Sequence, residues 1–228
     1  MIRKLPLWVW VGGVLLTLSA GLVNSVALLS FSNQAVTHVT GSVTLASTAL
    51  AQQNWAVLSH LSMVVFCFFL GAVLGGVITR GSRLRLGRRY GVALIVECFL
   101  LLVSMMLFKH SSFWGQMFAS LACGLQNALV STFSHAVIRT THMSGIVTDL
   151  GAKIGYWLSG RGIDKRRFAL YLLLLSGFFT GGVLGAWCFG LVGYKTLILA
   201  ALITGLSGIL SLIHVMGIRR RSESLVIS

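Results

Sequence analysis

The sequence predicts an all-α membrane protein with six transmembrane helices, arranged as two inverted three-helix repeats. Three observations predict this fold class: the composition, an internal repeat and the placement of Lys and Arg. Of the 228 residues, 56% are hydrophobic and 10% are charged, whereas a soluble domain carries about 25% charged residues. The net charge of +14 is concentrated at the ends of apolar runs, which is typical of membrane orientation signals and lipid contacts rather than of nucleic-acid binding.

Six apolar runs are long enough to cross a hydrocarbon core about 30 Å thick, which takes about 20 helical residues. The runs cover residues 7–30, 57–79, 90–108, 113–135, 168–190 and 194–217. Met1–Ala20 has the composition of a signal peptide. We nevertheless expect this segment to belong to the fold, because the repeat gives it an equivalent at 113–135. Residues 1–110 and 111–228 then form the two repeats of one integral membrane domain.

The repeat consists of three pairs of matched segments that occur in the same order in each half. They are GLVNS at 21–25 with GLQNA at 124–128, THVTG at 37–41 with THMSG at 141–145, and FFLGAVLG at 68–75 with FFTGGVLG at 178–185. Three ordered matches indicate duplication of the whole unit.

The positive-inside rule sets the orientation. With the N-terminus in the cytoplasm and six crossings, 16 of the 18 Lys and Arg residues fall inside, and only Lys109 and Lys195 fall outside. If 37–52 and 141–158 also crossed, a large basic cluster would lie on the wrong side. Six crossings put three helices in each half, so the second half is inverted, as in many secondary transporters. Both termini are then cytoplasmic, in a bacterial inner membrane.

Residues 31–55 and 136–160 are too apolar for a solvated loop and too rich in hydroxyl groups for a lipid-facing helix. Threonine and serine at 37, 40, 141 and 144 occupy expected N-cap positions. We predict a short re-entrant helix in each half, with its Thr-His start near the middle of the membrane. The alternative is a pair of amphipathic helices that lie at the two interfaces.

Two acids are candidates for proton coupling. Glu97 lies well inside an apolar run, where a charge is costly. It is expected to be a proton-relay group, a counter-ion to Arg88 or Arg89, or a neutral acid in a structural hydrogen bond. Asp149 corresponds to Leu45 in the first half. It serves either coupling or cation binding, or else a salt bridge to Lys153 four residues on.

Other polar residues indicate a binding site, but none of them indicates catalysis. His38 and His142 occupy matched positions, which favours a shared site or proton-linked gating. Asn24 and Asn127 line a polar path or join helices. The sequence contains no catalytic triad motif, phosphate loop or metal-ligand spacing, and its four cysteines are isolated. We therefore expect no enzyme activity, no metal and no cofactor.

Glycines recur at four-residue spacing at Gly71 and Gly75, and at Gly181 and Gly185. Such spacing marks close packing of helices, either within the chain or between the subunits of a homodimer.

The segments GLQNA at 124–128 and IRTTHMSGIVTDLG at 138–151 resemble the YoaK-like family of bacterial membrane proteins, a domain-of-unknown-function group. The resemblance covers nearly the whole chain. It implies a multi-pass inner-membrane protein of about six helices, without an established substrate. The characteristic positions that the resemblance implies are Thr40, Gly41, Asn127, Arg139, Thr141, Gly145 and Asp149.

These observations predict a small-solute secondary transporter or permease, proton-coupled through Glu97 or Asp149. Its partners would be membrane lipids and a small solute, which Arg139 would make anionic or amphiphilic. The expected substrate-binding residues are Thr37, His38, Thr40, Gly41, Asn127, Arg139, Thr141, His142, Ser144 and Gly145. The alternative is a non-transporting scaffold or partner subunit, whose functional surface would be the glycine faces.

Overall fold

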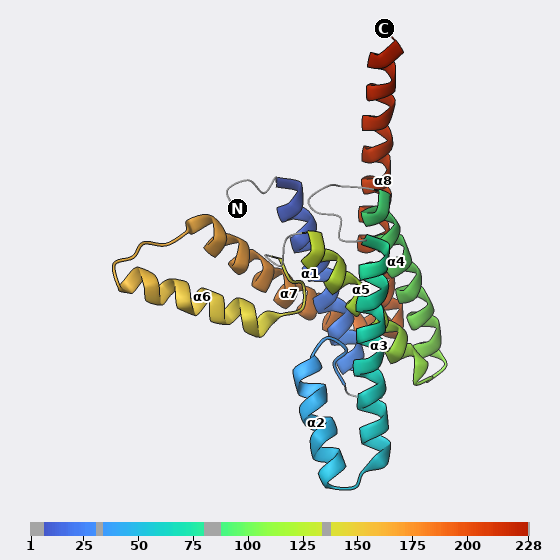
Figure 1. Cartoon of the computed structure of the whole chain (residues 1–228). Coiled ribbons are helices and arrows are strands. Elements are labelled where there is room, and N and C mark those ends of the chain that lie inside the picture. The colour runs from blue at the N-terminus through green and yellow to red at the C-terminus, as the bar shows by residue number, and fades with distance from the viewer. Residues whose placement is uncertain (1–6, 31–33, 80–87, 134–137, 228) are drawn as a thin grey trace.

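The computed structural model describes residues 7–30, 34–79, 88–133 and 138–227 (Figure 1). All secondary structure in this part of the chain is helical. The helices are α1 (Leu7–Leu28), α2 (Val39–Ala51), α3 (Trp55–Thr79), α4 (Arg88–Lys109), α5 (Trp114–Phe133), α6 (Met143–Leu158), α7 (Lys165–Val192), the 3-10 helix η2 (Gly193–Thr196) and α8 (Leu197–Ile227). The six predicted apolar runs coincide with α1, α3, α4, α5, α7 and α8, so the all-helical fold class is confirmed.

Equivalent side chains begin the third helix of each repeat. Asn54 Oδ1 accepts a hydrogen bond of 3.2 Å from the Val57 amide at the start of α3. Asp164 Oδ1 accepts one of 3.2 Å from the Arg167 amide at the start of α7. Each bond satisfies an amide that has no partner within its helix. The two caps extend the sequence correspondence of α3 with α7, at an offset of 110 residues, to the first residues of both helices.

The two repeats are interleaved, because their helices pair across the halves. Helix α1 packs against α7, α5 packs against α3, and α4 packs against α8. The central bundle in Figure 1 is therefore built from both repeats, and α1 forms part of it as expected.

The paired glycines lie in these contacts. A Cβ added at Gly75 would lie 2.9 Å from Ala128 Cβ and 3.0 Å from the Leu125 carbonyl oxygen. At the matched position, a Cβ on Gly185 would lie 2.8 Å from the Leu22 carbonyl oxygen and 3.2 Å from Ser25 Cβ.

The glycines of the first position, Gly71 and Gly181, approach the backbone carbonyls of Leu121 and Leu18 even more closely. The spacing thus serves packing within the chain. A homodimer would need another surface than these glycine faces.

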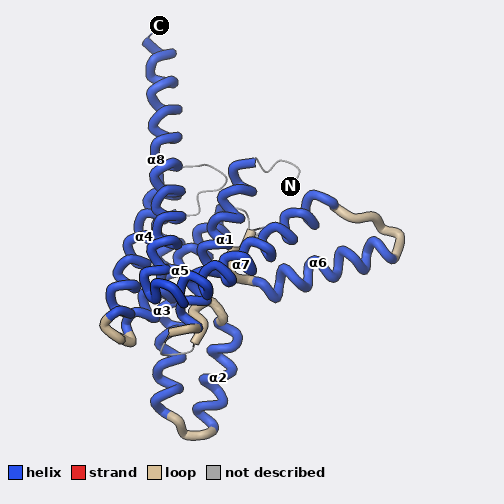
Figure 2. The backbone as a smooth tube through the Cα atoms, turned by 180° about the vertical axis from the view of Figure 1, so that it is seen from behind, coloured by secondary structure: helices blue, strands red, loops and turns tan. Residues whose placement is uncertain are grey.

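The short helices α2 and α6 form hairpins with α3 and α7, and both hairpins project from the bundle (Figures 1 and 2). Helix α2 packs along α3, whereas α6 packs less extensively against α7. The two copies therefore differ in how closely the short helix packs on the long one. A cavity beside α6 is described below.

Large apolar side chains lie on the outside of the bundle as well as in its core. Leu22, Leu94 and Leu125 are buried, yet Phe99 and Trp187 are more than 60% exposed. Four stretches of the described chain are long and apolar enough to cross a membrane: Leu7–Leu28, Trp55–Thr79, Arg88–Lys109 and Lys165–Val215. The last contains α7 and the first part of α8, separated by η2, where Gly193 has a φ of 60°.

Helix α5 is more polar than the other long helices, and the bundle buries its polar side chains. Gln116 and Gln126 are at most 1% exposed. The Gln116 side chain bridges His60 Nε2, at 2.9 Å, and the Gln34 carbonyl oxygen, at 3.0 Å. Gln126 Nε2 donates to the Leu16 carbonyl oxygen at 3.0 Å. These amides fasten α5 to its neighbours through groups that water cannot reach.

Candidate functional site

The starts of α2 and α6 have the same backbone geometry. The residues that precede these helices are His38, with φ −90° and ψ 59°, and His142, with φ −90° and ψ 60°. Neither makes a side-chain capping bond. The expectation that threonine and serine cap these helices is therefore wrong.

The Thr37 hydroxyl has another partner, since it donates to Asn24 Oδ1 at 2.8 Å. The same oxygen accepts the Thr37 amide at 3.1 Å. The two bonds tie the start of the α2 segment to α1, and they use the hydroxyl that was expected to cap the helix.

The glycine of each Thr-His-x-Thr/Ser-Gly motif makes room for the histidine. A Cβ on Gly41 would overlap the imidazole of His38, and a Cβ on Gly145 would overlap that of His142. Each ring therefore lies over the first turn of its helix, in a position that only glycine permits. The motif thus places an imidazole over the first turn of a helix.

A cavity of about 680 Å³ lies between the two helix starts, and we call it the central cavity. Its wall contains matched residues from both repeats: Asn24 with Asn127, Thr37 with Thr141, His38 with His142, Val39 with Met143, Thr40 with Ser144, and Phe68 with Phe178. Leu28 and Ala35 complete it. The lining combines amides, hydroxyls and imidazoles with aliphatic, thioether and phenyl groups, and none of them carries a permanent charge. The polar groups can hydrogen-bond to a ligand, and the apolar ones can contact its carbon atoms.

The two asparagines of the central cavity are not equivalent in their bonding. Asn24 Oδ1 accepts two hydrogen bonds from Thr37. Asn127 Oδ1 is buried and has no hydrogen-bond partner among the described residues. In the second repeat the tether is shifted to the neighbouring amide, because Thr140 Oγ1 donates to Gln126 Oε1 at 3.5 Å. The Asn127 amide oxygen is thus left unsatisfied beside the cavity, which is a costly state for a buried acceptor.

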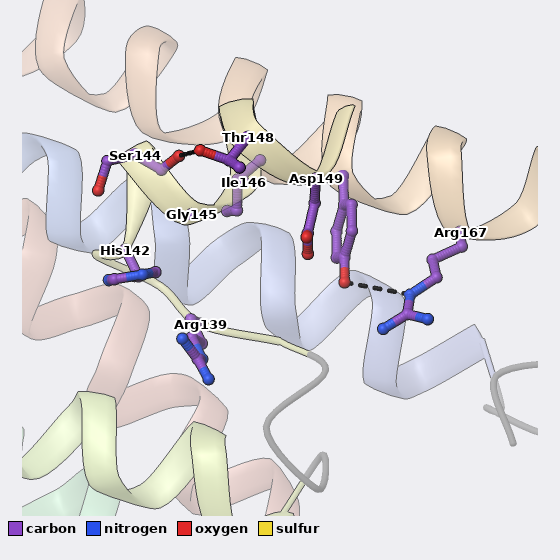
Figure 3. Close-up of a pocket in the computed structure, with 9 residues that line it drawn as sticks. Arg139, His142, Ser144, Gly145, Ile146, Thr148, Asp149 and Arg167 are labelled. Carbon is purple, nitrogen blue, oxygen red and sulfur yellow. Dashed lines mark hydrogen bonds between the residues drawn. The ribbon is translucent and has the colours of Figure 1, made fainter. Parts of the chain in front are cut away.

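A second cavity, of about 460 Å³, adjoins the first and is called the charged cavity. Its lining, drawn in Figure 3, consists of Arg139, His142, Ser144, Gly145, Ile146, Thr148, Asp149, Arg167 and Tyr171. His142 and Ser144 line both cavities. The start of α6 therefore separates a charged compartment from a neutral one.

Tyr171 organises the charged groups of this cavity. Its side chain is 3% exposed, and its hydroxyl accepts a hydrogen bond of 3.1 Å from Arg167 Nε. Asp149 lines the same cavity, and Lys153 Nζ lies 5.6 Å from the centre of the ring. Within the described part of the chain no salt bridge joins Asp149 to Lys153.

The structure divides the predicted site residues between the two cavities and two positions outside them. Those that line the central cavity are Thr37, His38, Thr40, Asn127, Thr141, His142 and Ser144. Arg139, Gly145 and Asp149 line the charged cavity. Gly41 lies beneath the His38 ring, and Glu97 lines neither cavity.

Glu97 is 2% exposed in the middle of α4, and its Oε2 has no hydrogen-bond partner among the described residues. No arginine of the described chain forms an ion pair with it. The counter-ion interpretation therefore finds no support in this part of the structure. The four cysteines are free, and no cluster of three or more metal-ligating side chains occurs among the described residues.

Sequence reasoning missed several lining residues of the two cavities, among them two phenylalanines, an arginine and a tyrosine. Phe68 and Phe178 were visible as a repeat match but were not proposed as site residues. Arg167 belongs to a basic run that reads as an orientation signal. Tyr171 gave no signal at all, since an isolated tyrosine in an apolar helix is typical of membrane proteins.

Long apolar helices with lipid-compatible outer faces, enclosing cavities lined by polar groups, define a helical membrane protein. The family comparison agrees with that class. The chain belongs to the DUF1275 family, described as proteins of unknown function, whose model matches residues 12–210. This match is consistent with the YoaK-like resemblance. No curated protein and no solved structure matches the chain.

Proposed function

We propose that this protein is a permease of the bacterial inner membrane, a secondary transporter that binds a small polar solute in the central cavity. The observation that carries the proposal is the composition of the cavity wall, which takes the same positions from both repeats. A site shared by two repeats of opposite orientation can be exposed to either side of the membrane in turn.

The proposed topology has six crossings, with the second repeat inverted and both termini in the cytoplasm. Helices α2 and α6 contain 13 and 16 residues. At 1.5 Å per residue they are about 20 and 24 Å long, which is short of the hydrocarbon thickness of about 30 Å. They would therefore enter the membrane from opposite faces without crossing it. The distribution of Lys and Arg supports this orientation.

Solute recognition would combine hydrogen bonds with aromatic contact. A donor of the solute, such as a hydroxyl or an amide N–H, would satisfy the Asn127 oxygen that has no partner among the described residues. Phe68 and Phe178 would contact its apolar part. The charged cavity would form the cytoplasmic mouth of the path, where Arg139 favours an anionic or amphiphilic solute.

Proton coupling has one candidate beside the path and one away from it. Asp149 lines the charged cavity, where a proton could exchange with the cytoplasm. Glu97 is buried on α4 and lines neither cavity. Asp149 is the better placed for coupling that responds to solute.

The alternative, a non-transporting scaffold, required the glycine faces to be available as its functional surface. Gly71, Gly75, Gly181 and Gly185 contact other helices of the same chain. No specific observation therefore favours a non-transporting role.

Cysteine accessibility in intact cells tests the proposal. The native cysteines are replaced, and single cysteines are placed at Thr40 and Ser144, which line the central cavity. Matched controls at Gln52 and Ser159 lie in the exposed turns of the two hairpins. We expect a membrane-impermeant thiol reagent to label Thr40→Cys from outside and Ser144→Cys from inside. If neither reacts while both controls do, no wet path reaches the cavity and the permease proposal fails.

Flux gives the second test. The protein is reconstituted in liposomes and screened with a panel of labelled polar solutes. Replacing His38 and His142 together by Ala should abolish the flux of any solute that the parent carries. An exposed hydroxyl on the lipid side, Thr180, provides the control as Thr180→Val. Unchanged flux in the folded double variant would contradict a role for the paired helix starts.

A further inference from the structure

We propose that the charged cavity binds an anionic group, a carboxylate or a phosphate, presented either by a solute or by a lipid headgroup. The inference deepens the proposed function, and it relies on that function only for onward passage to the central cavity. Binding itself follows from the charges, contacts and repeat relations of the cavity wall.

The charges of the cavity do not balance. Arg139 and Arg167 line it together with a single acid, Asp149, and Lys153 lies beside Tyr171. Among the described residues no salt bridge connects Asp149 with either arginine. Arg139 and Asp149 are exposed, and Arg167 and Lys153 are half-buried, so solvent reaches this group of charges. The excess of cations over carboxylates makes the cavity attractive to an anion.

The fold of the hairpin does not require these charges. The first repeat builds the same short helix, the same histidine geometry and the same capped long helix. At offsets of 104 residues before the turn and 110 after it, the counterparts of Arg139, Asp149, Arg167 and Tyr171 are apolar. These counterparts are Ala35, Leu45, Val57 and Leu61. Since the scaffold forms without charges in one copy, their presence in the other points to a ligand.

The geometry holds the positive groups in place. The bond from Arg167 Nε to the buried Tyr171 hydroxyl fixes the guanidinium and leaves its two terminal nitrogens for an anion. Ser144 and Gly145, in the first turn of α6, lie in the cavity wall. A helix start adds partial positive charge at this point.

The volume indicates that the anionic group belongs to a larger molecule. About 460 Å³ lies within the range of about 300–1,000 Å³ that is usual for small-molecule sites. It would hold a carboxylate or phosphate together with an organic body. Both a soluble organic anion and the headgroup of an acidic lipid meet this description.

Equilibrium binding to the purified full chain tests the inference without any need for transport. In one arm the protein sits in phosphatidylcholine nanodiscs, and its unfolding midpoint is followed as butyrate or inorganic phosphate is added at constant ionic strength. Butyramide serves as the uncharged control. In the other arm, native mass spectrometry measures retention of phosphatidylglycerol from mixed nanodiscs.

The decisive variants are Arg139→Gln and the matched control Arg161→Gln, which removes an exposed arginine outside the cavity. We expect Arg139→Gln to weaken anion binding about tenfold or more, and Arg161→Gln to leave it unchanged. Loss confined to the butyrate or phosphate arm identifies a soluble anion, and loss confined to the lipid arm identifies a headgroup. Arg139→Lys, which keeps the charge, should retain binding and covers the case in which the glutamine variant does not fold.

Equal binding by Arg139→Gln and Arg161→Gln in both arms would overturn the inference, as would the absence of binding by every anionic probe. The result is separable from the transport proposal. A protein can bind the anion and fail the flux test, or pass the flux test with no selective anion site.

Discussion

Two glycines of α3, Gly71 and Gly76, have different surroundings. Substitution by alanine is therefore predicted to affect the contact between α3 and α5 at Gly71 but not at Gly76. A Cβ at Gly71 would overlap the backbone carbonyl of Leu121, whereas a Cβ at Gly76, on the same helix, would meet nothing within 4 Å. A carbonyl cannot rotate away as a flexible side chain can. Accommodating Gly71→Ala therefore requires the two helices to separate along their contact.

The size of the effect follows from the difference between the variants. Both gain the same helix propensity, up to about 1 kcal/mol for Gly to Ala, so this contribution cancels in the comparison. Overpacking of a tight contact costs about 1–3 kcal/mol. Because the overlap is with backbone, Gly71→Ala should lose about 3 kcal/mol of unfolding free energy relative to Gly76→Ala.

The assay is reversible unfolding in mixed micelles of dodecyl maltoside and SDS, followed by circular dichroism. The second repeat supplies an independent copy of the experiment. Gly181 contacts the Leu18 carbonyl and Gly190 has open space around it, so Gly181→Ala and Gly190→Ala should show the same difference. Equal stability of Gly71→Ala and Gly76→Ala would refute the packing. A difference in one repeat only would refute the correspondence between the repeats.

Three further substitutions test single features of the bundle. Gln116→Leu should lower the unfolding free energy by about 1–3 kcal/mol, because it removes the buried bridge to His60; thermal unfolding in detergent measures this. Gly145→Ala should displace the His142 imidazole while changing stability by no more than about 1 kcal/mol, and NMR of ¹⁵N-labelled histidine should show that signal move; an unmoved signal would exclude the ring position. Glu97→Leu should keep or raise the unfolding free energy, since a buried carboxyl oxygen without a described partner is replaced by an apolar side chain; a large loss would reveal a missed partner.

The helices and the central cavity could be predicted because the sequence encodes them twice. Apolar runs give the long helices directly, since each must present side chains to lipid as well as to the core. The duplicated Thr-His motif identifies the two helix starts. A duplicated element that folds in the same way in each half tends to meet its copy at an internal symmetry axis. The prediction that Thr37 and Thr141 share one site needs no more than this.

Part of the charged cavity was predicted, since Arg139 and Asp149 line it, but the contribution of α7 was not. In the sequence, Arg167 is one member of a basic run after the turn, with no sign that its side chain differs from those of its neighbours. Its role comes from Tyr171, one helical turn on, which holds the guanidinium. The loose contact of α6 with α7 then leaves space beside them. Neither the pairing nor the space has a signature in hydropathy.

The capping error has a similar cause. A hydroxyl close to a helix start satisfies the sequence rule for an N-cap, but Thr37 is within reach of a better partner on another helix. Asn24 Oδ1 binds both its hydroxyl and its amide. The tendency of Thr37 to cap its own helix was overridden by its contact with Asn24, which lies 13 residues earlier in the chain. The helix start was left without a side-chain cap, and the imidazole of His38 took the position above it.

The residues that the two repeats share have a different role from the residues in which the repeats differ. Matched residues build the frame: the glycine contacts, the caps of α3 and α7, and the imidazoles over the helix starts. Some unmatched residues also hold that frame, as Gln116 and Gln126 do on α5, whereas the hairpin of the first repeat forms without the charges of the second. The unmatched set includes Arg139 and Asp149, and it extends to the unequal bonding of Asn24 and Asn127. Under the proposed permease function, a symmetric frame would give a path that can be entered from either face. Chemistry placed on one side of such a path would then distinguish the two faces.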